Sequence, residues 1–216
     1  MTKKSKTKQR VFNIVFMFLV TLVFISGVSF AYLSTRQKVL LNEKLYLMRG
    51  ILESAGIAVP ESEKELGELY KDCVEEKTAA GESFYRIREA NTGKPIAYVF
   101  IQSGPGLWGR ITAAIGIKED GKSLLGVVFL EQNETPGLGG RITEPRFCNQ
   151  FKGKMGPFQM VPEGEPTRKN EFDAITGATI TSNAVRRILN RTLEKASQII
   201  KEENQSPEIK TVEGKL

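Results

Sequence analysis

Small and hydroxyl-bearing residues gather near the end of the chain, where residues 173–182 read Asp-Ala-Ile-Thr-Gly-Ala-Thr-Ile-Thr-Ser. Gly177 permits a tight turn that a bulkier residue would resist. Ser182 or Thr181 is the expected N-cap of a following helix, which places Thr179 in the turn before it. That helix is predicted from apolar residues at helical spacing, namely Val185, Ile188, Leu189, Leu193, Ala196, Ile199 and Ile200.

This arrangement favours a phosphate group beside Thr179. The first N–H groups of a helix lack intrahelical acceptors, and the positive end of the helix dipole attracts anions. The competing interpretation is an ordinary capped turn ahead of a surface helix. Local physics also leaves the choice between the hydroxyls of Thr179 and Thr181 open.

A second stretch suited to ligand contact is Glu134-Thr135-Pro136-Gly137-Leu138-Gly139-Gly140, directly after a predicted strand. Its three glycines and one proline predict a loop of restricted shape around a single apolar side chain. Such a loop can bring backbone N–H groups and Leu138 against a flat ring, because glycine places no side chain in the way. The alternative is a plain connector.

Residues 104–109 satisfy the pattern G-x-G-x-x-G but do not indicate a dinucleotide site. That pattern should open a helix, whereas residues 111–117 read as a strand. Pro105 also removes a backbone N–H where the phosphates would need one. We therefore reject a Rossmann-type site.

Composition narrows the chemistry further. The chain has 216 residues and no histidine, which excludes Ser-His-Asp catalysis and histidine metal ligands. Two cysteines, Cys73 and Cys148, are too few for an iron–sulfur cluster and leave open one disulfide or two free thiols. Residues 34–216 hold 26 basic and 25 acidic side chains, which argues against a nucleic-acid partner. Any redox chemistry must therefore come from a bound cofactor.

Thr176-Gly177-Ala178-Thr179 resembles the S/T-G-A-T flavinylation motif of the FMN-binding domain family, whose members serve membrane electron-transport complexes of the Rnf and Nqr types. Asp173 matches the acidic position ahead of that motif. Residues 134–139 are similar to the family's second signature, and residues 106–109 resemble a Gly-Leu-Trp-Gly loop of the Nqr type. The resemblance covers most of residues 80–200, with both signatures in the family's order.

The resemblance implies an FMN joined by a phosphoester to Thr179, with Thr176, Gly177, Ala178, Thr181 and Asp173 around the attachment point. It implies ring contacts from Glu134, Thr135, Gly137 and Leu138. Trp108 is interpreted either as a packing anchor or as a wall of the flavin pocket. A flavin transferase would install the group from FAD with a divalent metal, and Asp173 is a candidate for that step. No catalytic residue and no metal site are expected in the chain itself.

We therefore expect an electron-transfer subunit of an ion-translocating membrane oxidoreductase that does not turn over a substrate alone. Its partners would be the other subunits of the complex and, during maturation, the flavin transferase. The alternatives are a stand-alone membrane-anchored flavoprotein outside the cytoplasm and a flavin-free exported module with a structural or sensing role.

Residues 11–33 contain no charged residue and span about 34 Å as a helix, enough for a bilayer core of about 30 Å. We interpret them as a retained anchor rather than a cleaved signal peptide, whose apolar region is shorter. Basic residues before the segment predict a cytoplasmic N-terminus in the inner membrane and an FMN domain outside the cytoplasm. These residues are Lys3, Lys4, Lys6, Lys8 and Arg10.

The remaining pattern predicts an α+β domain with an antiparallel sheet. Residues 36–57 form an amphipathic helix, interpreted as a stalk, a partner contact or a core helix. Residues 63–76 predict an acidic helix with a capping box from Ser62 and Glu65. Two hairpins follow, residues 84–101 around a turn at 91–94 and residues 111–130 around a turn at 119–122.

The expected organisation has five parts. They are a cytoplasmic basic tail (1–10), a transmembrane anchor (11–33), a helical connector (34–78), the FMN-binding domain (79–204) and a flexible tail (205–216).

Overall fold

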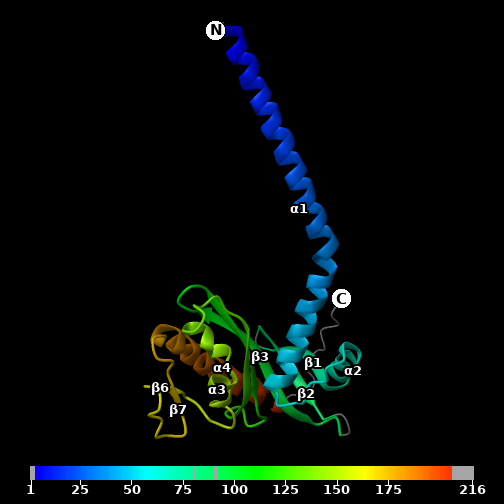
Figure 1. Cartoon of the computed structure of the whole chain (residues 1–216). Coiled ribbons are helices and arrows are strands. Elements are labelled where there is room, and N and C mark those ends of the chain that lie inside the picture. Colours follow the sequence, from blue (N-terminus) through cyan, green and yellow to red (C-terminus); the bar gives the residue numbers. More distant parts are fainter. Residues whose placement is uncertain (1–2, 80, 90–91, 206–216) are drawn as a thin grey trace. The chain divides into compact units, whose positions relative to one another are not determined.

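A computed structural model describes residues 3–79, 81–89 and 92–205. These residues fall into two units that divide between Lys44 and Leu45 (Figure 1). Helix α1 (Lys3–Ser54) crosses the division without a break. Among the described residues it is the one helix long and apolar enough to cross a membrane, with a mean hydropathy of 2.5 in its most apolar window. No side chain of residues 11–33 is buried within the protein, as expected of a segment that faces lipid.

The end of α1 belongs to the core of the second unit. Met48 and Leu52 pack with Leu66 of helix α2 (Glu63–Cys73), and Ile51 packs against one face of the sheet. Of the three sequence interpretations of residues 36–57, the core helix is therefore confirmed for residues 48–54. The helix continues from the apolar segment because no proline interrupts residues 11–54.

The second unit is built on a five-stranded antiparallel sheet in the order β1-β2-β3-β4-β5. Both predicted hairpins are present, and the α+β prediction is confirmed. Asn91 of the first predicted turn lies outside the described residues, but Gly93 adopts φ +66° as a tight turn requires. The strands are β1 (Val74–Ala79), β2 (Glu82–Arg88), β3 (Pro95–Pro105), β4 (Arg110–Ile117) and β5 (Leu124–Glu131).

The predicted acidic helix was too long. Helix α2 ends at Cys73, and residues 74–79 form the additional edge strand β1. Charged side chains made this segment resemble a solvated helix face, but Glu75 pairs with Arg86 and Arg88 of β2. Ser62 precedes α2 but makes no side-chain cap bond, so the predicted capping box is wrong.

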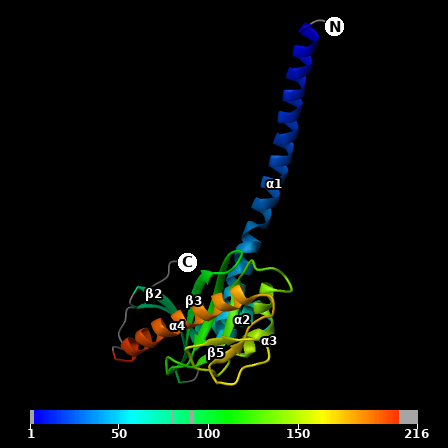
Figure 2. The same cartoon turned by 90° about the vertical axis from the view of Figure 1, so that its left-hand side faces the viewer.

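Helix α4 (Thr179–Gln205) lies across the other face of the sheet, as Figure 2 shows. Its apolar stripe, including Val185, Leu189 and Leu193, packs into the main core as predicted. Between β5 and α4 the chain forms the short helices η1 (Gly139–Thr143) and α3 (Pro145–Asn149). A two-stranded parallel sheet of β6 (Gln159–Val161) and β7 (Glu171–Asp173) precedes α4. Residues 206–216 of the predicted tail lie outside the described residues.

Gly116 of β4 lets the end of α1 approach the sheet closely. A Cβ atom at Gly116 would lie 1.9 Å from the backbone oxygen of Ser54 and 2.5 Å from its carbonyl carbon. No side-chain rotation relieves a clash with backbone. The contact between α1 and β4 therefore depends on glycine at this position.

We expect Gly116→Ala to lower the free energy of unfolding by about 3 kcal/mol, because the helix must shift away from the sheet. Gly67→Ala in α2 is the matched control, because nothing lies within 4 Å of the added methyl group. That control should raise stability by roughly 0.5–1 kcal/mol through the higher helix propensity of alanine. Urea unfolding of the detergent-solubilised chain measures both, and equal effects would contradict the assigned close approach.

Candidate functional site

The side chain of Glu134 joins two loops and the start of helix α4, which lie apart in the sequence. Its Oε1 accepts hydrogen bonds from the backbone N–H groups of Leu107, at 2.9 Å, and Trp108, at 3.0 Å. Its Oε2 accepts a hydrogen bond from the hydroxyl of Thr181 at 2.5 Å. The carboxylate is 5% exposed, so these donors replace the water that it loses on burial. Glu134 thus ties the β3–β4 loop and its own loop to the first turn of α4.

Two glycines make room for this carboxylate. A Cβ atom at Gly106 would lie 2.4 Å from Glu134 Oε1, and one at Gly139 would lie 2.7 Å from Thr181 Oγ1. The sequence interpretation assigned the glycines of residues 134–140 to the approach of a flat ring, and it gave Gly106 no such role. In the structure, Gly106 and Gly139 serve the packing of Glu134 against Thr181.

The turn at residues 175–178, here called the attachment turn, leads directly into α4. Gly177 has φ +80°, a left-handed conformation that favours glycine. Ser182 holds the turn from inside, because its hydroxyl accepts from the N–H of Ile175 at 3.0 Å and donates to the carbonyl of Ala178 at 3.0 Å. The predicted N-cap role of Ser182 or Thr181 is wrong, since α4 already begins at Thr179.

The two candidate hydroxyls differ in access. Thr179 is exposed at the first position of α4, whereas Thr181 is 1% exposed and its hydroxyl is bound to Glu134. Thr179 also lines a surface hollow of about 320 Å³. The other lining residues come from β6, the loop after it, the residue after β7 and the attachment turn: Met160, Val161, Pro162, Glu163, Ala174, Ile175, Thr176 and Gly177.

Exposed apolar side chains come from the two loops and the first turn of α4 that Glu134 joins. Trp108 is 71% exposed, so the packing-anchor interpretation is wrong for this residue. Leu138 is exposed and lies beside the attachment turn, with its Cδ2 3.1 Å from the position of a Cβ atom at Gly177. The exposed members of this group are Leu107, Trp108, Leu138 and Ile180.

The loop around Leu138 is closed by its own backbone. The carbonyl of Thr135 accepts from the N–H groups of Leu138, at 3.1 Å, and Gly140, at 3.0 Å. Gly137 has φ +74° and no atom within 4 Å of an added Cβ. The structure therefore presents Thr135, Gly137 and Leu138 on one exposed, internally bonded loop, while the Glu134 side chain is directed into protein.

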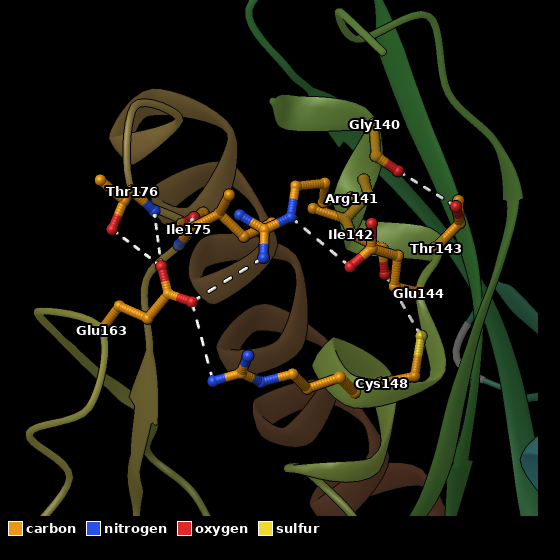
Figure 3. A network of polar contacts seen from close by, with 11 residues as sticks. Gly140, Arg141, Ile142, Thr143, Glu144, Cys148, Glu163, Ile175 and Thr176 are labelled. Carbon is orange, nitrogen blue, oxygen red and sulfur yellow. Dashed lines mark hydrogen bonds and ion pairs between the residues drawn. The ribbon is translucent and has the colours of Figure 1, made fainter. Parts of the chain in front are cut away.

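A second carboxylate holds the attachment turn from outside (Figure 3). Glu163, in the β6–β7 loop, accepts from the hydroxyl of Thr176 at 2.8 Å and from its N–H at 3.3 Å. Arg141 and Arg146 approach the other carboxylate oxygen, each at 3.8 Å. The two Thr176 donors, and then the arginines, lower the pKa of Glu163, so it is ionised at neutral pH.

Sequence reasoning missed Glu163 and the arginines, because no motif links residues so far apart in the chain. Asp173, which it did single out, accepts a hydrogen bond from the N–H of Gly164 at 2.8 Å. Asp173 therefore supports the loop that carries Glu163.

The cysteines add no cross-link to this region. Cys73 and Cys148 are both free, and burial raises the pKa of the Cys148 thiol to about 11. Cys148 donates a hydrogen bond to the carbonyl of Ile142 at 3.2 Å. Within the described ranges, no group of three or more cysteine, aspartate or glutamate side chains is arranged to hold a metal ion.

We expect Glu134→Ala to destabilise the chain by about 3 kcal/mol, because three donors lose their shared acceptor. Trp108 is the single tryptophan, so its fluorescence anisotropy should fall as the β3–β4 loop gains motion. Glu131→Gln is the matched control, since that exposed carboxylate bonds only the hydroxyl of Thr112, at 3.3 Å, among the described residues. Unchanged anisotropy in Glu134→Ala would show that the carboxylate does not order the loop.

Comparisons with known proteins show which proteins this chain resembles. Residues 106–194 match the FMN-binding domain. The NqrC subunit of the Na(+)-translocating NADH-quinone reductase of Vibrio anguillarum is 35% identical over 116 residues, which cover 46% of each chain. The corresponding subunit of Chlamydia pneumoniae is 35% identical over 112 residues, covering 41% of this chain and 35% of the relative. The chain thus spans about half the length, or less, of these curated relatives.

Solved structures extend the similarity to the fold. NqrC of Shewanella oneidensis superposes with a TM-score of 0.64 at 19% identity, covering 72% of this chain and 96% of that one. The corresponding NqrC subunit of Parabacteroides distasonis superposes with a TM-score of 0.63 at 26% identity, covering 76% and 96%. Residues 106–194 of this chain therefore match an FMN-binding domain, and the sequence and fold of the chain resemble those of the NqrC subunits of Na(+)-translocating NADH-quinone reductases.

Proposed function

We propose that this chain is an electron-carrier subunit of a membrane oxidoreductase complex of the Nqr type, with FMN held covalently through Thr179. The observation that carries the proposal is the exposed hydroxyl of Thr179 at the start of α4, inside the segment that matches the FMN-binding domain. It lies beside a surface hollow, in the sequence Thr176-Gly177-Ala178-Thr179.

The start of α4 fits a phosphate group. The first three N–H groups of the helix, from Thr179 to Thr181, have no intrahelical acceptor, and the helix dipole favours negative charge there. Thr179 adds an accessible hydroxyl at the same point, whereas the hydroxyl of Thr181 is buried against Glu134. The local geometry thus supports Thr179 over Thr181 as the attachment point.

The exposed apolar loops fit the flavin ring system. Leu138 offers apolar contact area beside the attachment turn, Trp108 offers more on the neighbouring β3–β4 loop, and Thr135 and Gly137 share the loop of Leu138. Glu134 keeps these loops together from beneath rather than contacting the ring, since both of its oxygens are hydrogen-bonded within the protein. When bound, FMN supplies transfer of one or two electrons, which the side chains of the site do not provide.

The proposed location explains why a covalent bond would be useful. We assign residues 11–33 to the bilayer, with the basic N-terminus in the cytoplasm and residues 79–204 outside it. A free flavin nucleotide could diffuse away from a site outside the cytoplasm, and a phosphoester prevents that loss. The partners would be the other subunits of the complex and the flavin transferase that modifies Thr179.

We expect Thr179→Ala to abolish covalent flavin while leaving the fold intact, because Thr179 is exposed and its hydroxyl forms no hydrogen bond with the described part of the chain. Intact mass spectrometry after co-expression with a flavin transferase should show a gain of about 438 Da in the natural chain, the mass of FMN less one water. Thr179→Ser retains a hydroxyl and should retain the modification.

The matched control is Thr176→Ser, which keeps a hydroxyl at the motif's first position and should also be modified. Absorbance at about 450 nm that survives denaturation separates a covalent flavin from a bound one. A natural chain without the added mass, or a modified Thr179→Ala variant, would contradict the proposal.

We expect external protease on spheroplasts to degrade residues 79–204 while a tag on the N-terminus stays protected, because basic residues are retained on the cytoplasmic side. Immunoblots against the two ends measure the result. Replacing the five basic residues by glutamine should reduce the difference in protection between the two ends. These residues are Lys3, Lys4, Lys6, Lys8 and Arg10. Protection of the FMN domain in the natural chain would contradict the assigned orientation.

A further inference from the structure

We propose that Glu163 is a positioning residue for flavin attachment, acting through Thr176 to set the conformation of the attachment turn. The inference rests on the proposed modification of Thr179. Glu163 lies outside both recognisable sequence signatures, and it becomes part of the site only through the fold.

The first support is the double contact between Glu163 and Thr176. One carboxylate oxygen accepts from both donors of Thr176, the N–H at 3.3 Å and the hydroxyl at 2.8 Å. Both contacts reach the same residue, so they fix its backbone and its side chain together. Thr176 lies three residues before Thr179, and the exposed Gly177 between them has φ +80°.

The second support is that two different side chains, one buried and one at the surface, hold the attachment turn. Ser182 bonds its inner side at Ile175 and Ala178, and it is fully buried. Glu163 bonds its outer side at Thr176, in the view of Figure 3. Without Glu163, the contacts from Ser182 would still fix Ile175 and Ala178, but Thr176 and Gly177 would be free to reorient.

The third support is that Glu163 is itself held in place. Arg141 and Arg146 approach its second oxygen at 3.8 Å, which keeps the first oxygen directed at Thr176. Arg146 is mostly exposed, so solvent screening weakens its attraction to the Glu163 carboxylate. The backbone of the same loop is tied at the neighbouring Gly164, whose N–H donates to Asp173 at 2.8 Å. Asp173, at the end of β7, therefore anchors the β6–β7 loop, and Glu163 links that loop to the attachment turn.

The consequence for attachment follows from geometry. The transfer forms a bond between the Thr179 oxygen and the flavin-bearing phosphorus of FAD, breaks the diphosphate bond, and releases AMP and the hydroxyl proton. Such a transfer is fast only when the hydroxyl is presented in one orientation. A fixed Thr176 limits the motion of Gly177 and so restricts how Thr179 is presented to the transferase.

The first test needs no flavin. Hydrogen exchange of the Thr176 amide is measured in the full chain from a host without the transferase. Glu163→Ala should speed this exchange about tenfold, the effect of losing a hydrogen bond to a charged group. Glu165→Ala is the matched control, because that exposed side chain lies in the same loop and forms no hydrogen bond or ion pair with the described residues. In Glu165→Ala, the Thr176 amide should exchange at the same rate as in the natural chain.

The second test measures the initial rate of modification with a purified flavin transferase, FAD and magnesium. Glu163→Ala should slow the gain of mass about tenfold at an unchanged thermal midpoint, while Glu165→Ala keeps the natural rate. Thr176→Val removes the hydroxyl, and Thr176→Ser should restore the rate. Adding Thr176→Val to Glu163→Ala should slow the reaction little further, because Glu163→Ala already removes the hydroxyl contact that valine would lose.

The outcomes separate this inference from the proposed function. A natural chain that gains no flavin would overturn both. A natural chain that is modified, with Glu163→Ala modified equally fast or Glu165→Ala slowed equally, would overturn the positioning role alone. Fully additive effects of Glu163→Ala and Thr176→Val would also overturn it.

Discussion

The buried carboxylate of Glu134 is the interaction on which the candidate site depends. Removing a charged group from water is costly unless donors replace the lost hydration. Here the donors come from Leu107, Trp108 and Thr181, so separate segments of the chain supply hydrogen bonds to the same carboxylate. Because the carboxylate loses a donor if either loop or the start of α4 moves away, these three segments are expected to order together.

The sheet and α4 explain why these loops can meet. Loop 106–109 joins β3 to β4 at one end of the strands. The antiparallel pairing of Thr112 with Glu131 brings the end of β5 to that same end of the sheet. Helix α4 lies across that sheet and is tied at both ends. Thr181 bonds Glu134 near its start, and Glu203 near its end pairs with Lys77 at 3.4 Å and with Arg86 at 2.9 Å. Exposed loops on such a rigid support are a common setting for ligand binding.

The two carboxylates of the site do different work. Glu134 is buried and orders the loops that carry the apolar side chains, whereas Glu163 is partly exposed and bonds the attachment turn beside Thr179. Thr179 itself is left without such a restraint, which keeps its hydroxyl accessible. The arrangement therefore combines hydrogen-bonded surroundings with one accessible hydroxyl.

The amino-acid sequence alone determined the apolar segment, the α+β class, both hairpins and the long final helix, because local periodicity and turn residues report these directly. It also determined the matching motifs around Thr179. Only the tertiary structure decided that residues 74–79 form a strand, that α4 begins at Thr179, and that Trp108 is exposed. It alone revealed the hydrogen bonds of Glu134 and Glu163. These bonds join residues that are distant in the sequence, and a local sequence pattern does not indicate which distant donors a carboxylate will bind.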